Sequence, residues 1–135
     1  MYTRHHAGIS ALVGVALAVT VSTPLPAPLL VVGATLLGTF VDLDHFLIAR
    51  VRTGDWNALV RCLRSPRVAF LDQDEIFEGD AVGAWPRLGT HVLITAAVVA
   101  ALTVVSPALA LAAGVVLVVH IGCDAAWDVR RGALP

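Results

Sequence analysis

Lysine is absent from this chain of 135 residues, and charged residues of every kind are scarce. Only 14% of the residues are charged, whereas 58% are hydrophobic and the mean hydropathy is +0.84. This apolar content lies well above the roughly 45–50% of soluble domains, so the composition indicates a membrane protein, and the length suits a single domain. We attribute the absence of lysine to a GC-rich genome, and it carries no mechanism.

Motifs that would assign other classes of function are also missing. Cys62 and Cys123 form no recognisable pattern, so we expect no disulfide, and we interpret Cys123 as a small core residue rather than a ligand. The chain contains no phosphate-binding glycine loop and no nucleic-acid module, and therefore no nucleic-acid partner is expected.

The apolar residues are gathered in four runs. Counting the polar end of each run brings it to roughly the 20 residues that span a bilayer. We therefore predict an all-α, four-transmembrane-helix bundle in which 1–135 forms one membrane domain, with helices at about 6–22, 29–50, 89–105 and 108–127. A cleaved signal peptide is the alternative for the first run. The sequence from Pro24 to Pro28 offers only a poor cleavage site, which favours a retained helix.

The arginines predict how the helices are oriented. The two expected outer turns, at 22–28 and 106–107, carry no charge. Every arginine therefore falls in the N-terminal arm, in the Arg50–Arg87 connection or in the C-terminal tail, and two helical hairpins place these segments on one side. The positive-inside rule makes that side cytoplasmic. We expect a multi-pass protein of the cell membrane with both termini in the cytoplasm.

The 51–88 connection is expected to carry a short amphipathic helix that begins after Asp55. Arg61 and Arg64 lie off its apolar stripe, where they could contact lipid phosphates at the membrane interface. A soluble helix packed on the end of the bundle is an equally open alternative. The apolar stripe consists of Trp56, Leu59, Val60 and Leu63. The acidic run at 72–80 that follows is interpreted as a solvated loop, although it could supply a ligand or a general base.

Two carboxylates and a histidine interrupt the second apolar run. Asp42, Asp44 and His45 follow about a dozen apolar residues, and ionisable groups within an apolar helix mark a functional site by default. Asp42 and His45 are three residues apart and so share a helix face. Carboxylate oxygen and imidazole nitrogen together suit zinc, with manganese or magnesium as alternatives.

The other three runs bring ligand-type residues to the same depth. At a rise of about 1.5 Å per residue, these residues lie roughly 20–26 Å from the outer turns. A lone histidine is more often a core residue than a ligand, but coincidence at one depth in four helices favours a metal site. The predicted ligands are His6, Asp42, Asp44, His45, His91, His120 and Asp124. His5 is the alternative to His6, and Asp128 is expected in solvent with Arg130 and Arg131.

The order of these motifs resembles that of a known family. The matching segments are His6, Asp42–His45, Thr90-His91 and His120–Asp124. They resemble the YdjM-like predicted membrane-bound metal-dependent hydrolases, also described as LexA-binding, inner-membrane-associated hydrolases. Two positions depart from the family pattern: Val41 replaces a proline, and Pro86 stands where the family has a histidine. The second departure removes one expected ligand and leaves open whether the family's activity is retained.

The resemblance implies hydrolysis of an ester or phosphoester by a metal-activated water, with a divalent metal as cofactor. Asp42 or Glu75 would act as general base. Membrane lipids are the expected surroundings, and the substrate would be lipid-like or phosphate-bearing, contacted by Arg61, Arg64 and Arg87. A catalytically silent protein with a structural or partner-binding metal site is the alternative. A metal or ion transporter is disfavoured because its ionisable groups should lie near the bilayer midplane.

Overall fold

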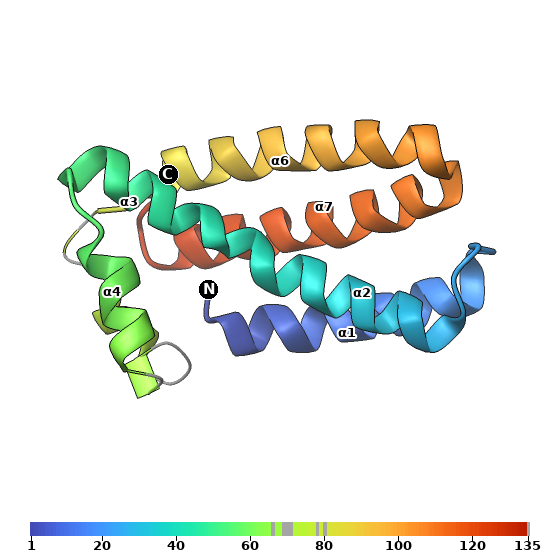
Figure 1. Ribbon diagram of the computed structural model, residues 1–135, viewed down its shortest axis with the longest axis horizontal. Coiled ribbons are helices and arrows are strands. Elements are labelled where there is room, and N and C mark those ends of the chain that lie inside the picture. The colour runs from blue at the N-terminus through green and yellow to red at the C-terminus, as the bar shows by residue number, and fades with distance from the viewer. Residues whose placement is uncertain (66, 69–71, 78, 80, 135) are drawn as a thin grey trace.

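The computed structural model describes residues 1–65, 67–68, 72–77, 79 and 81–134. The described residues are almost entirely helical and include no strand, which confirms the all-α prediction (Figure 1). The elements are α1 (Thr3–Thr20), α2 (Ala27–Phe40), η1 (Val41–Leu43), α3 (Asp44–Thr53), α4 (Asn57–Arg64), η2 (Gln73–Glu75), α6 (Ala84–Val105) and α7 (Pro107–Arg130).

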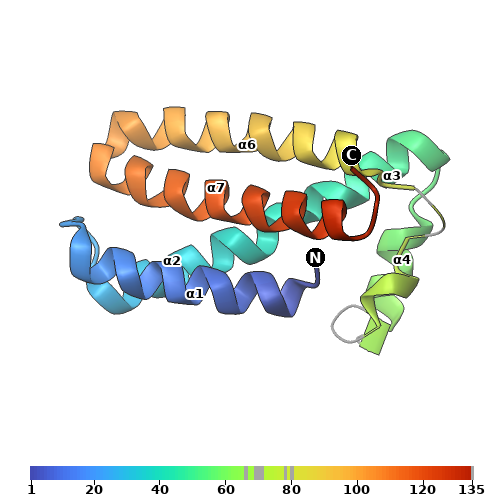
Figure 2. The same ribbon diagram turned by 180° about the vertical axis from the view of Figure 1, so that it is seen from behind.

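Two helical hairpins form the body of the molecule. Helix α1 packs along α2, helix α6 packs along α7, and α7 also contacts both α1 and α2. Both hairpin turns lie at one end, whereas the two chain termini, α3 and α4 lie at the other (Figures 1 and 2). We call these the outer end and the polar end. Prolines pre-set the backbone at the helix starts, and Ser106 Oγ accepts a hydrogen bond from the Leu109 amide (3.3 Å) to cap α7.

Among the described residues, three helices, not the expected four, are long and apolar enough to cross a membrane. They are Ala27–Thr53, which joins α2 to α3, then Ala84–Val105 and Pro107–Arg130. Helix α1 has 18 residues, and its first turn contains Arg4, His5 and His6. Counting this polar start into the span gives sufficient length but lowers the mean hydropathy of the helix. The prediction of four transmembrane helices is therefore corrected to three candidate spans in the described part of the chain.

The second run is not one continuous helix. It breaks into a 3-10 turn at Val41–Leu43, between α2 and α3, so the predicted helix at 29–50 is interrupted at the acidic motif. A 3-10 turn inside a longer helix is a common mark of a functional position. The third helix begins at Ala84 rather than near 89.

Small residues allow the helices to approach one another closely. A Cβ atom on Gly38 would lie 1.9 Å from Ser10 Oγ, and one on Gly14 would lie 3.0 Å from the Val31 backbone. Close approach at small residues is how helices associate in lipid, where apolar burial drives association only weakly. A core of Leu17, Leu30, Ala34, Ala112 and Val116 continues this packing towards the outer end.

Helix α4 lies crosswise at the polar end (Figure 1). Its amphipathic character is pronounced, and its N-cap residue is Trp56 rather than the expected Asp55. Asp55 lies one residue earlier, where its Oδ1 accepts a hydrogen bond from the Asn57 amide (2.9 Å). Arg61 Nη1 donates to the Glu75 carbonyl (2.6 Å). Gln73 is joined to Thr3 by two hydrogen bonds of 2.8 and 2.6 Å. These contacts tie α4 and η2 to the bundle.

Candidate metal centre

Histidines and aspartates from α1, the α2–α3 segment, α6 and α7 meet at the polar end. Each lies on a helix that the hairpin arrangement brings to the same level, and the rings of His6 and His120 stack with centroids 3.8 Å apart. The exposed fractions are 1% for His6, 0% for His91, 2% for His120 and 0% for Asp124. Burial of this many ionisable groups requires compensation by charge or hydrogen bonds.

Four of the residues form a first group that could hold a metal ion. The ligand atoms of His6, Asp42, His120 and Asp124 all lie within 4.8 Å of one another. His6 Nε2 is 3.1 Å from Asp124 Oδ1, and His120 Nε2 is 3.5 Å from Asp124 Oδ2. Three different helical segments thus contribute to this group.

A second group consists of Asp42, His45 and His91, with the same 4.8 Å limit. The two groups share Asp42. Its Oδ1 atom lies 3.4 Å from His45 Nε2, 3.5 Å from His91 Nε2 and 3.3 Å from His120 Nε2. Asp44 borders this second group, with Oδ1 3.2 Å from His91 Nε2 and 3.7 Å from His45 Nε2. Asp42 Oδ1 is therefore the point on which three imidazoles converge.

Several buried polar atoms in the cluster have no hydrogen-bond partner among the described residues. They are Asp42 Oδ1, His45 Nε2, Arg87 Nε, His91 Nδ1, His120 Nε2 and Asp124 Oδ2. Unpaired buried polar atoms are rare and costly, and each calls for an explanation. All but Arg87 Nε are atoms that commonly bind metals. The residues present therefore fit a divalent cation.

Other groups hold the ligands in place. His120 Nδ1 is 2.9 Å from the Gly38 carbonyl oxygen, and donation of the Nδ1 proton to it would leave Nε2 as the ligand atom. The Thr90 hydroxyl donates to Asp44 Oδ2 and also lies 2.9 Å from the Arg87 carbonyl. Such outer partners fix the tautomer and ring orientation of metal-binding histidines.

Arg87 supplies positive charge beside the cluster. Its Nη2 donates to Asp128 Oδ2, and its Nε lies 3.7 Å from Asp124 Oδ2. The amino group of Met1 also donates to Asp124 Oδ1 (2.8 Å). Asp124 is thus surrounded by cationic and imidazole groups, which offset part of the cost of burying its carboxylate.

Six of the seven predicted metal ligands belong to these two groups, and the seventh, Asp44, borders the second group. Of the adjacent histidines, His6 is buried in the cluster, whereas His5 packs its ring near those of Tyr2 and Trp127. Glu75 is exposed and belongs to neither group, and Arg64 is exposed. Of the predicted phosphate-contacting arginines, only Arg87 lies beside the ligands. In the acidic run, Glu78 and Asp80 lie outside the described residues.

The prediction for Asp128 was wrong. Asp128 is 5% exposed and pairs with Arg87, rather than lying in solvent with Arg130 and Arg131. Its position four residues after Asp124, on the same helix face, is the signal that could have placed it in the site. Nothing in the sequence indicated that the Gly38 carbonyl would contact His120, because a backbone carbonyl is not recognised by a search for ligand-type side chains.

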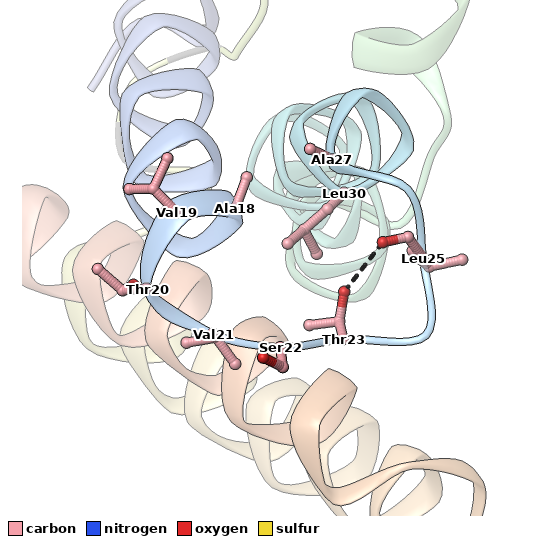
Figure 3. Close-up of a pocket in the computed structure, with 9 residues that line it drawn as sticks. All are labelled: Ala18, Val19, Thr20, Val21, Ser22, Thr23, Leu25, Ala27 and Leu30. Atoms are coloured by element: carbon pink, nitrogen blue, oxygen red, sulfur yellow. Dashed lines mark hydrogen bonds between the residues drawn. The ribbon is translucent and has the colours of Figure 1, made fainter.

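The structure has a cavity at each end. The outer one, about 310 Å³, lies between the end of α1 and the start of α2, and its lining has no ionisable residue (Figure 3). The second, about 590 Å³, lies at the polar end and is lined by Asp42, His45 and Arg87 as well as by apolar side chains. Cys62 also lines it, and burial raises the pKa of this thiol. Of these two cavities, the second reaches the His/Asp cluster.

No protein-family model, curated protein or solved structure matches this chain. The resemblance to the YdjM-like hydrolases therefore stays a prediction that depends on the order of the motifs.

Proposed function

We propose that this protein is a membrane-bound, metal-dependent hydrolase whose His/Asp cluster binds one or two divalent cations. The observation that carries the proposal is the environment of Asp42 Oδ1, a buried carboxylate oxygen without a hydrogen-bond partner and within 3.3–3.5 Å of three histidine Nε2 atoms. Because Asp42 belongs to both groups of ligands, its carboxylate is suited to bridging two ions. Without Asp42 the two groups would share no ligand.

The spacing of the ligand atoms favours zinc. Bonds of about 2.0–2.1 Å at the tetrahedral angle place neighbouring ligand atoms roughly 3.3–3.4 Å apart. The separations around Asp42 Oδ1 are 3.3, 3.4 and 3.5 Å. Magnesium demands near-octahedral geometry with several waters and few protein nitrogens, so it suits this histidine-rich set less well. Manganese is the main competitor.

A bound ion would supply a water of lowered pKa and would polarise the bond to be broken. The residues of the chain would position and assist that water. Asp42 lines the large cavity and is the better placed of the two carboxylates expected as general base, because Glu75 lies outside both ligand groups. Asp42 would have only its Oδ2 atom for this role, since Oδ1 is the atom on which the three histidines converge. Arg87, between Asp124 and Asp128, would orient an anionic ester group.

The polar end would face the cytoplasm. The N-terminal arm, the segment from Arg50 to Arg87 and the C-terminal tail hold all nine arginines, and both termini lie at this end (Figure 1). Helix α1 packs along α2, so its ends lie at levels similar to those of its neighbour even though its own hydropathy is lower. The order of the ligand motifs supports the kinship with the YdjM-like hydrolases.

A structural metal site is the second candidate function. The observations that favour it are the complete burial of His91 and Asp124 and the proline at position 86, where the resembled family has a histidine. In this case an ion would hold α1, α3, α6 and α7 together, and no substrate would be turned over. A transporter is disfavoured because the cavity at the outer end has no ionisable lining residue.

Elemental analysis of the purified protein tests the proposal. Wild-type protein should retain zinc or manganese through dialysis, and His6→Ala and Asp42→Asn should each reduce the metal content to about the background. His5→Ala is the matched control, because it removes the neighbouring histidine that packs outside the cluster. A wild type without metal, or equal loss in His5→Ala and His6→Ala, would refute the site.

A panel of ester and phosphoester substrates separates the two candidate functions. A hydrolase should cleave at least one class of substrate in a metal-dependent manner, with turnover abolished in His120→Ala and retained in His5→Ala. A metal-loaded protein that cleaves none of them, but loses thermal stability on chelation, would support the structural role.

A further inference from the structure

The cavity at the polar end has one polar floor and several apolar walls. Asp42 and His45 belong both to the ligand cluster and to the cavity lining. The walls include Phe46, Leu59 and Phe77. A ligand with a polar group at the cluster would therefore have its remaining atoms against hydrocarbon.

The side chains that form the cavity walls are held by contacts within the protein, so the cavity is not a space between loosely packed helices that lipid would fill. Helix α4 contributes Leu59 and Leu63 to one side. The two hydrogen bonds between Gln73 and Thr3 fasten η2 to the start of α1, and the bond from Arg61 to the Glu75 carbonyl fastens α4 to η2. The packing of Phe77 against Phe46, with ring centroids 5.5 Å apart, joins this segment to α3. The cavity is thus bounded by fixed contacts on three sides.

The size of the cavity limits its occupant. Its volume is about 590 Å³. With about 30 Å³ for each water-sized group, this volume holds roughly 20 non-hydrogen atoms. That number suits one alkyl chain of medium length and a small head group, and it is too small for a lipid with two long chains.

Charge at the floor selects the head group. Arg87, which is paired with Asp128, and Arg131 both line the cavity, and the bound cations of the proposed metal centre would supply most of the positive charge there. Arginine binds phosphate through two parallel hydrogen bonds, and phosphate oxygens are also good ligands for divalent ions. A neutral head group would form no ion pair with this positive charge.

We propose that the cavity binds a single-chain lipid with a phosphate monoester head group, the phosphate at the Asp42–His45–Arg87 floor and the alkyl chain between α4 and α3. The position of the head group depends on the proposed metal centre, whereas the binding of the chain depends only on the cavity. Hydrolysis of such a substrate would join a water oxygen to phosphorus and break the bond from phosphorus to the alkyl oxygen. The alkyl oxygen would take one proton from the water, so that inorganic phosphate and the alcohol are released.

Photocrosslinking tests this proposal in the intact protein reconstituted into lipid nanodiscs. The probe is dodecyl phosphate with a diazirine in its chain, and mass spectrometry identifies the labelled residues. We expect saturable labelling of the segments that carry Leu59, Leu63 and Phe77, removed by excess unlabelled dodecyl phosphate. Labelling of Leu93 on α6, which is 70% exposed and away from the cavity, should be weak and not saturable.

A pair of neighbouring substitutions provides the matched control. Leu59→Trp places a large ring in the cavity, whereas Val60→Trp adds the same ring to α4 at a position that does not line it. Leu59→Trp should weaken probe binding about tenfold, since the loss of apolar contact by even two methylene groups changes affinity by that factor. Val60→Trp should leave binding unchanged. Equal effects of the two substitutions would overturn the proposal.

Competition experiments separate the parts of the ligand. Dodecyl phosphate should compete better than dodecanol, and inorganic phosphate should compete poorly. Competition by dodecanol equal to that by dodecyl phosphate would overturn the assignment of the head group, and equal competition by inorganic phosphate would overturn that of the chain. Labelling at Leu93 as strong and as saturable as in the cavity would overturn the whole proposal.

Measurements of metal distinguish this proposal from that of the hydrolase. The same labelling is repeated with His120→Ala protein, together with elemental analysis of both proteins. Saturable cavity labelling in a wild type that contains no metal would refute the metal centre and support the binding of the chain. A metal-loaded wild type without saturable labelling would overturn the lipid proposal and leave the metal centre standing.

Discussion

The outer and polar ends of the molecule are built from the same four long helices, but their interiors differ in kind. Towards the outer end, leucine, valine and alanine fill the space between the helices, and the cavity there has no ionisable lining residue. At the polar end, four histidines and three aspartates occupy the corresponding positions, and six of the polar atoms at that end have no hydrogen-bond partner among the described residues.

This difference shows what each end requires. Towards the outer end no ligand is needed for stability, because the core there is formed by apolar side chains that pack on one another. The polar end brings ligand atoms together without enough hydrogen-bond donors to satisfy them, and a buried arrangement of this kind is stable only when charge is compensated. The contrast between the unpaired polar atoms at the polar end and the apolar core towards the outer end indicates a bound cation.

Removal of metal should have the largest effect, and it should act only through the polar end. With free metal at about 1,000 times its Kd, binding contributes roughly 4 kcal/mol to stability, so a chelator should lower the Tm by roughly 10–20 °C. Differential scanning fluorimetry of the protein in detergent measures this shift. His120→Ala protein, which lacks a ligand, should show almost no response to the chelator. An unchanged Tm of metal-loaded wild type would contradict the proposed centre.

Truncation of a core leucine towards the outer end should destabilise the fold without affecting metal. Leu17 is 6% exposed, and Leu17→Ala should cost about 2 kcal/mol, at the low end for buried leucine because lipid is itself apolar. The control is Leu12→Ala in the same helix, because Leu12 is 72% exposed. Thermal denaturation and metal content are measured together. A loss of metal in Leu17→Ala would show that the two ends are not independent.

Gly38 connects the two kinds of interior, and substitution there should have an intermediate effect. A Cβ atom at this position would lie 1.9 Å from Ser10 Oγ and 2.8 Å from Ser10 Cβ, and the Gly38 carbonyl orients His120. Gly38→Ala should therefore cost about 1–2 kcal/mol and also weaken metal binding. Gly33→Ala in the same helix, where a Cβ would meet nothing within 4 Å, should be neutral or stabilising. Equal Tm values for the two variants would contradict the close packing.

The fold and the ligands were predictable to the extent that they depend on local patterns. Apolar runs and uncharged turns predicted the hairpins, and equal distances from the turns predicted that His6, His91 and Asp124 would meet. The number of candidate spans was not predicted correctly, since a polar first turn adds length to α1 while lowering its hydropathy. The break at Val41–Leu43 was also missed, because a 3-10 turn needs no proline or glycine to form.

Pairings between distant residues were less predictable. Asp128 was expected in solvent because Arg130 and Arg131 follow it, yet its partner is Arg87, 41 residues earlier in the chain. Charged residues nearby in the sequence are a weak guide to the ion-pair partner of a helical residue, because successive residues of a helix face different neighbouring elements. The cavity beside Asp42 depends likewise on how α4 and η2 fold back onto α1, which no local pattern encodes.

The smallest effect is expected from an outer partner of the ligands rather than from a ligand. The Thr90 hydroxyl donates to Asp44, so Thr90→Val should weaken metal binding about tenfold, as is usual when such a partner is lost. Thr103→Val on the same helix is the matched control, because the Thr103 hydroxyl bonds to the Val99 carbonyl (2.7 Å), remote from the cluster. Competition with a metal-binding dye gives both affinities. A decrease in metal affinity in both variants would mean that α6 as a whole, rather than the hydrogen bond to Asp44, controls the site. A decrease confined to Thr90→Val would show that the polar end depends on hydrogen-bond partners of the ligands as well as on the ligands themselves.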